Sequence, residues 1–162
     1  MKRVLAVLIA VMMAMTLLAG CGSKTQKDTG ASSGTPSTEA KYKDGIYFAQ
    51  EDKFNEKTGW KYVVTLEVKD GKIVKADWNG ANVKGGMDKK AFDKAGKYQM
   101  KAKGKASAEW YEQAEKAEAH LLKTQDPAAI TYKDDEGHTD AISGATIHVK
   151  EFFDLAKMAL DK

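Results

Sequence analysis

Cysteine is nearly absent from the sequence: the 162 residues include a single one, Cys21. A lone cysteine excludes disulfides within the chain, and it excludes metal or redox sites built from several cysteines. Long apolar segments are also scarce. The apolar run from Val4 to Met15 is shorter than the roughly 20 residues that a membrane-spanning helix needs. The sequence therefore excludes a disulfide framework and does not predict a membrane span in its first residues.

Neither sign of charge dominates the chain. It holds 26 Lys and Arg residues against 23 Asp and Glu residues, a formal net charge of +3. Lys2 and Arg3 lie in the first 20 residues, and without them the net charge falls from +3 to +1. The remaining lysines are scattered and are most simply a solvated surface. This balance gives no reason to expect nucleic acid as a partner.

Residues 1–20 are typical of a secretory signal peptide, because two basic residues precede an apolar run and small residues follow it. The segment leads into Leu18-Ala19-Gly20-Cys21, which resembles the lipobox of bacterial lipoproteins. The resemblance implies that Cys21 takes a diacylglycerol, becomes the new N-terminus and anchors the protein to the membrane on the outer face of the cell. The alternative is a free thiol beside a plain secretory cleavage site.

Residues 21–41 are predicted to be the lipidated cysteine followed by a flexible linker. From Gly22 to Lys41 the chain is rich in Gly, Ser, Thr and Lys and holds no aliphatic residue larger than alanine. Such a segment cannot bury enough apolar surface to offset the entropy lost on ordering. It is expected to let the following domain stand away from the bilayer.

Residues 42–162 have the size of one domain, and their pattern predicts an α+β fold. Alternating apolar residues predict strands at Tyr42–Ala49, Lys61–Lys69 and Lys72–Trp78. Asp70-Gly71 is a strong hairpin signal between the second and third of these. The expected fold is an antiparallel β-meander packed with two helices and preceded by a lipoprotein signal peptide and flexible tether.

The two helices are predicted in the second half of the chain. Ala106–Lys123 is rich in helix formers, and its apolar spacing places Trp110 toward the core. The closing segment carries an apolar stripe that includes Phe152. Between these elements, Asn79–Lys105 is expected to be rich in loops because Gly-containing pairs interrupt the pattern. Ile130–Tyr132 is expected to be a brief strand.

The segment Asp140-Ala141-Ile142-Ser143-Gly144-Ala145-Thr146 precedes the closing helix and allows two interpretations. In the first, Ser143 caps the helix by accepting a hydrogen bond from the Thr146 N–H, and Asp140 interacts with the helix dipole. In the second, unpaired N–H groups of the first helical turn face a phosphate. Small residues at Gly144 and Ala145 let a large group approach, and the Thr146 hydroxyl is placed to form a phosphate ester. Spacing alone does not choose between them.

The same segment resembles the flavinylation motif of FMN-binding domains, which has an acidic residue, two variable positions and Ser-Gly-Ala-Thr. That motif also marks the C subunit of the sodium-pumping NADH:quinone reductase and the G subunit of the Rnf complex. The resemblance implies that a flavin transferase of the ApbE type, using FAD and magnesium, joins FMN to the Thr146 hydroxyl through a phosphoester bond and releases AMP. It also implies that Asp140, Ser143, Gly144 and Ala145 form the turn that the transferase recognises and that then cradles the phosphate.

The likeness extends beyond the motif. Asp44-Gly45-Ile46-Tyr47, the hairpin from Lys69 to Ile73 and Trp78-Asn79-Gly80 are similar to the opening of that domain. The chain from Tyr42 resembles FMN-binding extracellular lipoproteins of Gram-positive bacteria, including the PplA type. Two differences concern the partner. The PplA type has two FMN domains, whereas a single Ser-Gly-Ala-Thr segment exists here, and a lipid anchor replaces the membrane helix of the respiratory subunits.

The resemblance implies an electron-transfer flavoprotein rather than a self-contained enzyme. Electrons would pass from a quinone-linked donor in the membrane, through the FMN, to an extracellular acceptor such as ferric iron or a partner reductase. The alternative is a non-redox lipoprotein that binds or senses a small ligand, with the Ser-Gly-Ala-Thr turn serving only as a helix cap. A third possibility is a protein that binds FMN reversibly and regulates something else.

Other residues give weaker signals. Trp78 is either a core residue or a flank of the flavin ring. His148 either approaches the flavin or faces solvent from the closing helix. The run Asp134-Asp135-Glu136 either binds a cation weakly or is a solvated turn. The three histidines are scattered and show no metal-ligand spacing, so no metal site is predicted.

Overall fold

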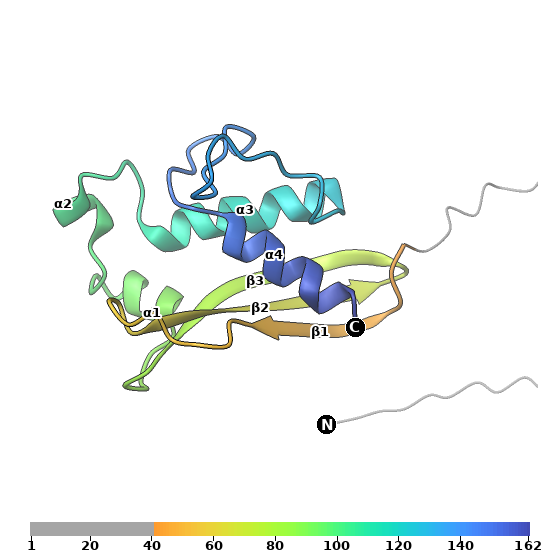
Figure 1. Ribbon diagram of the computed structural model, residues 1–162, viewed down its shortest axis with the longest axis horizontal. Helices are drawn as coiled ribbons and strands as arrows, with labels where there is room; N and C mark the ends of the chain where they lie inside the picture. Colours follow the sequence, from red (N-terminus) through yellow and green to blue (C-terminus); the bar gives the residue numbers. More distant parts are fainter. Residues whose placement is uncertain (1–40) are drawn as a thin grey trace, which may run out of the picture. The chain divides into compact units, whose positions relative to one another are not determined.

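The computed structural model describes residues 41–162 (Figure 1). The predicted signal peptide, Cys21 and all but the last residue of the predicted linker lie outside the described residues. Within the part of the chain that the structure describes, no helix is long and apolar enough to cross a membrane.

Three antiparallel strands form one sheet in the order β1-β2-β3. Strand β1 spans Gly45–Gln50, β2 spans Trp60–Lys69 and β3 spans Lys72–Asn82. The turn between β2 and β3 places Asp70 at φ +51° and Gly71 at φ +71°. Both residues are left-handed, which is the conformation that matches the twist of a two-residue hairpin. The predicted meander is therefore confirmed.

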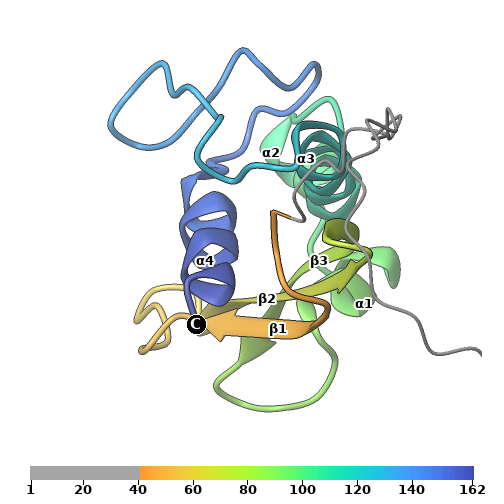
Figure 2. The same cartoon turned by 90° about the vertical axis from the view of Figure 1, so that its right-hand side faces the viewer.

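Four helices complete the fold: α1 (Lys89–Lys94), α2 (Met100–Gly104), α3 (Trp110–Thr124) and α4 (Lys150–Leu160). The two long helices lie over the same face of the sheet, α3 against β3 and α4 against β1 and β2 (Figure 2). This is the expected α+β arrangement, with two short helices added to the two that were predicted.

The core lies between the sheet and the two long helices. Val64, Leu66 and Val68 alternate along β2 and point toward the helices, because successive side chains of a strand face opposite sides. Trp78 of β3 is fully buried, which confirms its interpretation as a core residue. Trp110 of α3 is also buried, as predicted. The helices add the fully or nearly fully buried residues Ala114, Ala117, Leu121, Phe152, Phe153, Leu155, Ala156 and Ala159.

The segment predicted to be loop-rich, Asn79–Lys105, is more regular than expected. Strand β3 continues through Asn79 and Gly80, because these residues pair with Val63 and Tyr62 of β2. A side chain at Gly80 would press on Lys89, with its Cβ 3.0 Å from the Lys89 Cβ, so the glycine allows α1 to pack closely. The expected strand at Ile130–Tyr132 does not form, and these residues have no regular structure.

The start of the last helix also differs from the prediction. Helix α4 begins at Lys150, with Val149 as the residue that precedes it. Ile142 to Ala145 form a separate turn, closed by a hydrogen bond from the Ala145 N–H to the Ile142 carbonyl at 3.1 Å, and Thr146 follows it. Ser143 is therefore not a helix cap, and the argument from a first helical turn does not apply to this segment.

Candidate functional site

Thr146 is exposed, and its backbone and side chain are both held by one buried amide. The Thr146 N–H donates to Gln113 Oε1 at 2.7 Å, and the Thr146 hydroxyl donates to the same oxygen at 3.1 Å. Gln113 lies on α3, is fully buried and donates from Nε2 to the Ala108 carbonyl at 3.0 Å. The hydroxyl predicted to carry the cofactor is thus anchored to a long helix, although the turn around it is exposed.

A cavity of about 260 Å³ opens beside this hydroxyl and is called the Thr146 pocket below. Tyr62 of β2 and Trp110 of α3 form an aromatic wall, with ring centroids 5.9 Å apart and planes within 12° of parallel. The lining comes from β2, α2, α3, α4 and the connections before α2 and α4. It consists of Tyr62, Tyr98, Met100, Trp110, Thr146, Ile147, His148 and Glu151.

Two features of the lining bear on what the pocket can hold. One carboxylate oxygen of Glu151, Oε2, is buried and has no hydrogen-bond partner among residues 41–162. A buried acceptor without a partner is costly, so a ligand with an N–H or O–H group would stabilise it. Burial raises the pKa of both Tyr62 and Tyr98, which keeps these phenols neutral.

A buried lysine lies behind the aromatic wall. The Lys89 ammonium is 4.3 Å from the ring centre of Tyr98 and 4.9 Å from that of Trp110. It also lies over Trp60 at 5.3 Å and Tyr62 at 5.2 Å, and it donates to the Tyr98 hydroxyl at 3.1 Å. Burial lowers the pKa of Lys89 to about 8. At neutral pH the group remains mostly protonated, so the pocket has a fixed positive charge behind it.

The other residues predicted to form the recognition turn lie on the same loop. Gly144 has φ +75°, a conformation that favours glycine, and its carbonyl accepts a hydrogen bond from Lys116 Nζ at 3.3 Å. Ser143 is exposed, and Ala145 packs against the core. The Asp140 carboxylate is exposed and pairs with Lys133 at 3.5 Å. The Lys116 ammonium group therefore lies beside the turn.

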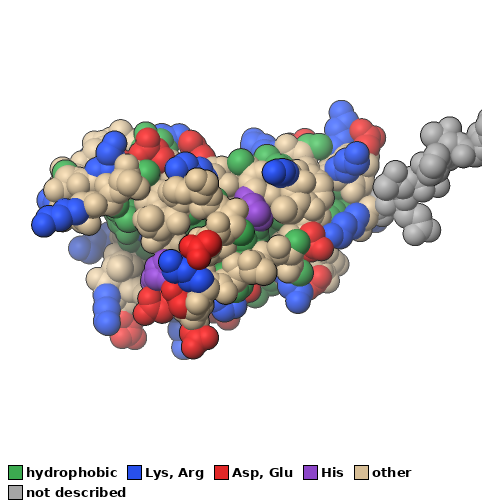
Figure 3. All heavy atoms as spheres, turned by 90° about the horizontal axis from the view of Figure 1, so that it is seen from above, with side chains coloured by type: hydrophobic (Ala, Val, Ile, Leu, Met, Phe, Trp, Pro, Cys, Tyr) green, Lys and Arg blue, Asp and Glu red, His purple; other side chains and the backbone are tan. Residues whose placement is uncertain are grey.

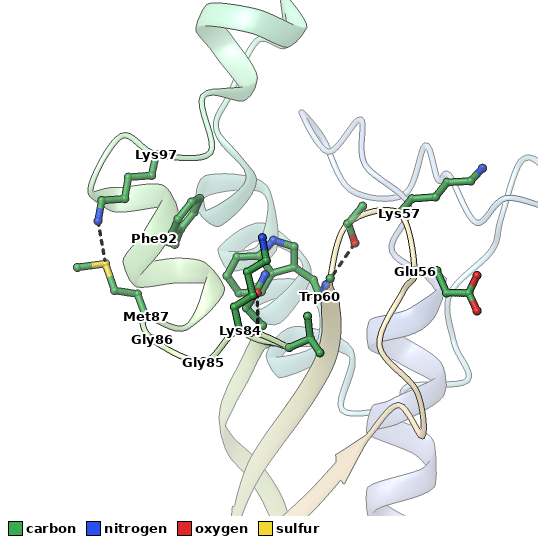
Figure 4. Close-up of a pocket in the computed structure, with 13 residues that line it drawn as sticks. Glu56, Lys57, Trp60, Lys84, Gly85, Gly86, Met87, Phe92 and Lys97 are labelled. Atoms are coloured by element: carbon green, nitrogen blue, oxygen red, sulfur yellow. Dashed lines mark hydrogen bonds between the residues drawn. The ribbon is translucent and has the colours of Figure 1, made fainter.

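A second cavity, of about 770 Å³, lies away from all the predicted site residues and is called the Trp60 cavity (Figure 4). In the close-up, Trp60, Phe92 and Lys84 point toward its middle, whereas Glu56 and Lys57 point outward. Gly85 and Gly86 form part of its edge. In the sequence, this glycine pair predicted a loop but gave no indication of a cavity.

The fold assembles a cluster of one carboxylate and two imidazoles next to the Thr146 pocket. The spacing of these residues in the sequence does not predict it. Glu136, His138 and His148 each place one possible ligand atom within 4.8 Å of the others. His148 precedes α4 rather than lying on it, and it lines the Thr146 pocket. Asp134 and Asp135 are exposed, as expected of a solvated turn.

Comparison with solved structures places the chain among known folds. The solution NMR structure of a structural genomics target from Clostridium thermocellum is 60% identical to it, with a TM-score of 0.58, over 74% of this chain and 90% of that chain. The chain belongs to the family of this Clostridium thermocellum protein.

A second relative of that fold is more distant. The crystal structure of a Clostridium perfringens protein is 27% identical to this chain, with a TM-score of 0.56, over 74% of this chain and 87% of that chain. No protein-family model matches the sequence, and no curated protein matches it. Both solved structures support the fold of this chain.

Proposed function

We propose that this protein is an electron-transfer flavoprotein that carries FMN on Thr146 through a phosphoester bond. The observation that carries the proposal is the position of the Thr146 hydroxyl, which lies exposed at the edge of an aromatic pocket and within an Asp-x-x-Ser-Gly-Ala-Thr segment. An exposed hydroxyl is accessible to a transferase enzyme. The buried amide of Gln113 holds it in one place.

The residues around the hydroxyl fit the group. Lys116 donates to the Gly144 carbonyl and brings positive charge to the turn that precedes Thr146. Tyr62, which is half-buried and stacks on the buried Trp110, offers aromatic surface to a planar ring. The unpartnered Glu151 oxygen would accept a hydrogen bond from an N–H or O–H of the cofactor.

The pocket is small for the whole cofactor. Its volume of about 260 Å³ lies below the range of roughly 300–1,000 Å³ that is usual for ligand pockets. Part of the flavin would therefore stay exposed, as an electron carrier that meets several partners requires. The Lys89 charge behind Tyr62 and Trp110 would favour negative charge on a ring bound there.

The flavin supplies the chemistry, because it accepts electrons singly or in pairs. We propose that electrons come from a quinone-linked donor in the membrane and pass to an extracellular acceptor, such as ferric iron or a partner reductase. Covalent attachment keeps the cofactor from being lost outside the cell. A lipid on Cys21 and a flexible linker would raise the effective concentration of the domain at the membrane surface.

Intact-mass measurement tests the attachment. The full chain is co-expressed with an ApbE-type flavin transferase, and its mass is expected to increase by one FMN less one water. Thr146→Ala is expected to abolish the increase. Thr131→Ala is the matched control, because Thr131 is an exposed threonine in a nearby loop, and it is expected to leave the increase intact. Wild-type protein that stays unmodified would contradict the proposal.

A second candidate is a non-redox lipoprotein that binds or senses a small ligand. The Trp60 cavity favours it, because that cavity is larger than the Thr146 pocket and has an apolar centre of Trp60 and Phe92 beside Lys84. The two candidates differ in a simple observation. Purified protein from the native host is yellow if it carries flavin and colourless if it does not.

A further inference from the structure

Two histidines from different segments lie edge to face where α4 begins. The ring centroids of His138 and His148 are 4.4 Å apart, with planes at 89°. A carboxylate oxygen of Glu136 lies 3.9 Å from His138 Nδ1 and 3.7 Å from His148 Nε2. One possible ligand atom from each of the three residues falls within 4.8 Å of the others. Three separate side chains thus converge on one small volume.

Backbone contacts hold the two segments together. The Val149 N–H donates to the Gly137 carbonyl at 2.9 Å, which fixes the residue after His148 against the residue before His138. Gly137 is buried against α4, where an added Cβ would collide with the Lys150 Cβ. Only glycine allows this close approach. The positions of the three side chains are therefore set by the backbone and not only by their own flexible ends.

Asp134 supports the cluster from outside. Its Oδ1 accepts a hydrogen bond from the His138 N–H at 3.0 Å, and its Oδ2 lies 2.7 Å from His138 Nδ1. A carboxylate on a ring nitrogen fixes the orientation of a histidine, so Asp134 holds the His138 ring in place beside Glu136. The carboxylates of Asp134 and Glu136 also supply negative charge that would offset a bound cation.

We propose that Glu136, His138 and His148 bind a divalent transition-metal ion, with Zn²⁺ the best match. Two imidazoles and a carboxylate are a ligand set that zinc accepts, and three protein ligands leave a fourth position open. Magnesium and calcium are disfavoured, because they prefer oxygen ligands. The side chains of His148 and Glu136 are 48% and 72% exposed, so the ion can enter from solvent without opening the fold. Figure 3 views the molecule from above, and histidine and acidic side chains reach the surface there.

The site is separate from the proposed flavin attachment, although His148 also lines the Thr146 pocket. The residues that hold the ion do not include Thr146 or the Ser143–Ala145 turn. Zinc binding can therefore be tested on protein produced without a flavin transferase. Failure of one proposal leaves the other standing.

Isothermal titration with ZnCl₂ tests the site. The full chain is used in detergent, without a histidine tag and with Cys21→Ser in every sample, so that neither a tag nor the thiol competes. One zinc ion per chain is expected. The double variant His138→Ala/His148→Ala is expected to lower the affinity by more than about 100-fold, because loss of a supporting residue alone costs roughly 10- to 100-fold.

Two carboxylate variants sharpen the test. Asp134→Asn is expected to weaken zinc binding by about 10- to 100-fold, because it removes the charge that supports His138. Asp135→Asn is the matched control: it removes an exposed carboxylate in the same turn, and it is expected to leave the affinity unchanged. The fold of each variant is checked by circular dichroism, since all the substituted side chains lie at or near the surface.

The histidine NMR signals give a second measurement. Zinc is expected to shift the ring signals of His138 and His148 and to leave those of His120, on α3, in place. The proposal is overturned if wild-type protein binds no zinc, or if the double variant binds zinc with the same affinity as wild type. It is also overturned if zinc shifts the signals of His120 instead.

Discussion

Replacing Lys89 with methionine removes an ammonium group that is buried among four aromatic rings. Lys89 is 2% exposed, and burial lowers its pKa from the ordinary 10.5 to about 8. Between these two pH values the unfolded chain binds a proton that the folded chain does not. The stability of the wild-type protein therefore rises as the pH increases from 8 to 10.5, and the contribution of Lys89 is least favourable below pH 8.

The size of the effect follows from the two pKa values. At pH 7 the buried charge costs about 3 kcal/mol relative to a neutral lysine. Raising the pH from 7 to 9.5 recovers about 2 kcal/mol of this cost. Lys89→Met has no such group and is expected to show no such rise. The variant also loses cation–π contacts that are worth about 0.5–2 kcal/mol each. The stability difference between wild type and variant at a single pH therefore mixes two effects. The change of that difference with pH reports the Lys89 charge alone.

Urea unfolding followed by tryptophan fluorescence at several pH values measures this change. The free energy of unfolding of wild type minus that of Lys89→Met is expected to increase by about 2 kcal/mol between pH 7 and pH 9.5. Measurements stop below pH 10, where tyrosines begin to ionise in the unfolded chain. Lys84→Met, at an exposed lysine, is the control and should track the wild type. A wild-type-minus-variant difference that stays flat with pH would refute the argument that Lys89 is buried with a depressed pKa.

Three further changes have defined outcomes. Glu118→Ala is expected to lower the free energy of unfolding by about 3 kcal/mol in a urea titration. The largely buried Lys90 ammonium lies 2.6 Å from the Glu118 carboxylate and would lose its more buried partner. Gly137→Ala is expected to cost about 2 kcal/mol or more, seen as a lower melting temperature, because the new methyl group would collide with Lys150. Gln113→Leu is expected to cost about 2 kcal/mol and to lower the flavin-modified fraction seen by mass spectrometry, because it frees the Thr146 hydroxyl.

Two of these changes have matched controls. Glu115→Ala removes a carboxylate whose ion pair with Lys94 is about half exposed, and it is expected to cost less than about 1 kcal/mol. Gly85→Ala places a methyl group in open space at a similar φ, so it isolates backbone strain from collision. Equal losses for Glu118→Ala and Glu115→Ala would contradict the role given to burial. A fully flavin-modified Gln113→Leu protein would show that the amide does not position Thr146.

Local sequence patterns predicted the sheet and the two long helices well. Alternation along Lys61–Lys69 and the Asp70-Gly71 turn depend on residues that are neighbours in the chain, and the hairpin formed as expected. The short helices α1 and α2 were not predicted, because Lys89–Lys94 and Met100–Gly104 are too short to show a period. Their stability comes from packing against the rest of the domain.

The candidate site was predicted in part. The Ser-Gly-Ala-Thr segment drew attention to Thr146, but its expected place in the first turn of a helix was wrong. The helix begins at Lys150, where the chain meets the Gly137 segment. The aromatic wall of Tyr62 and Trp110 could not be predicted, because these residues come from a strand and a helix that are joined only by packing.

The sequence by itself determined the order of the elements, the face of each strand and helix that is buried, and the segment that carries the candidate cofactor residue. These properties follow from backbone periodicity and turn conformation, which act over a few residues. Only the tertiary structure decided that Gln113 holds Thr146, 33 residues away. It also decided that Lys89 lies among four rings and that His138 meets His148. Such contacts depend on how the helices and strands pack against one another, and no short-range pattern in the sequence predicts them.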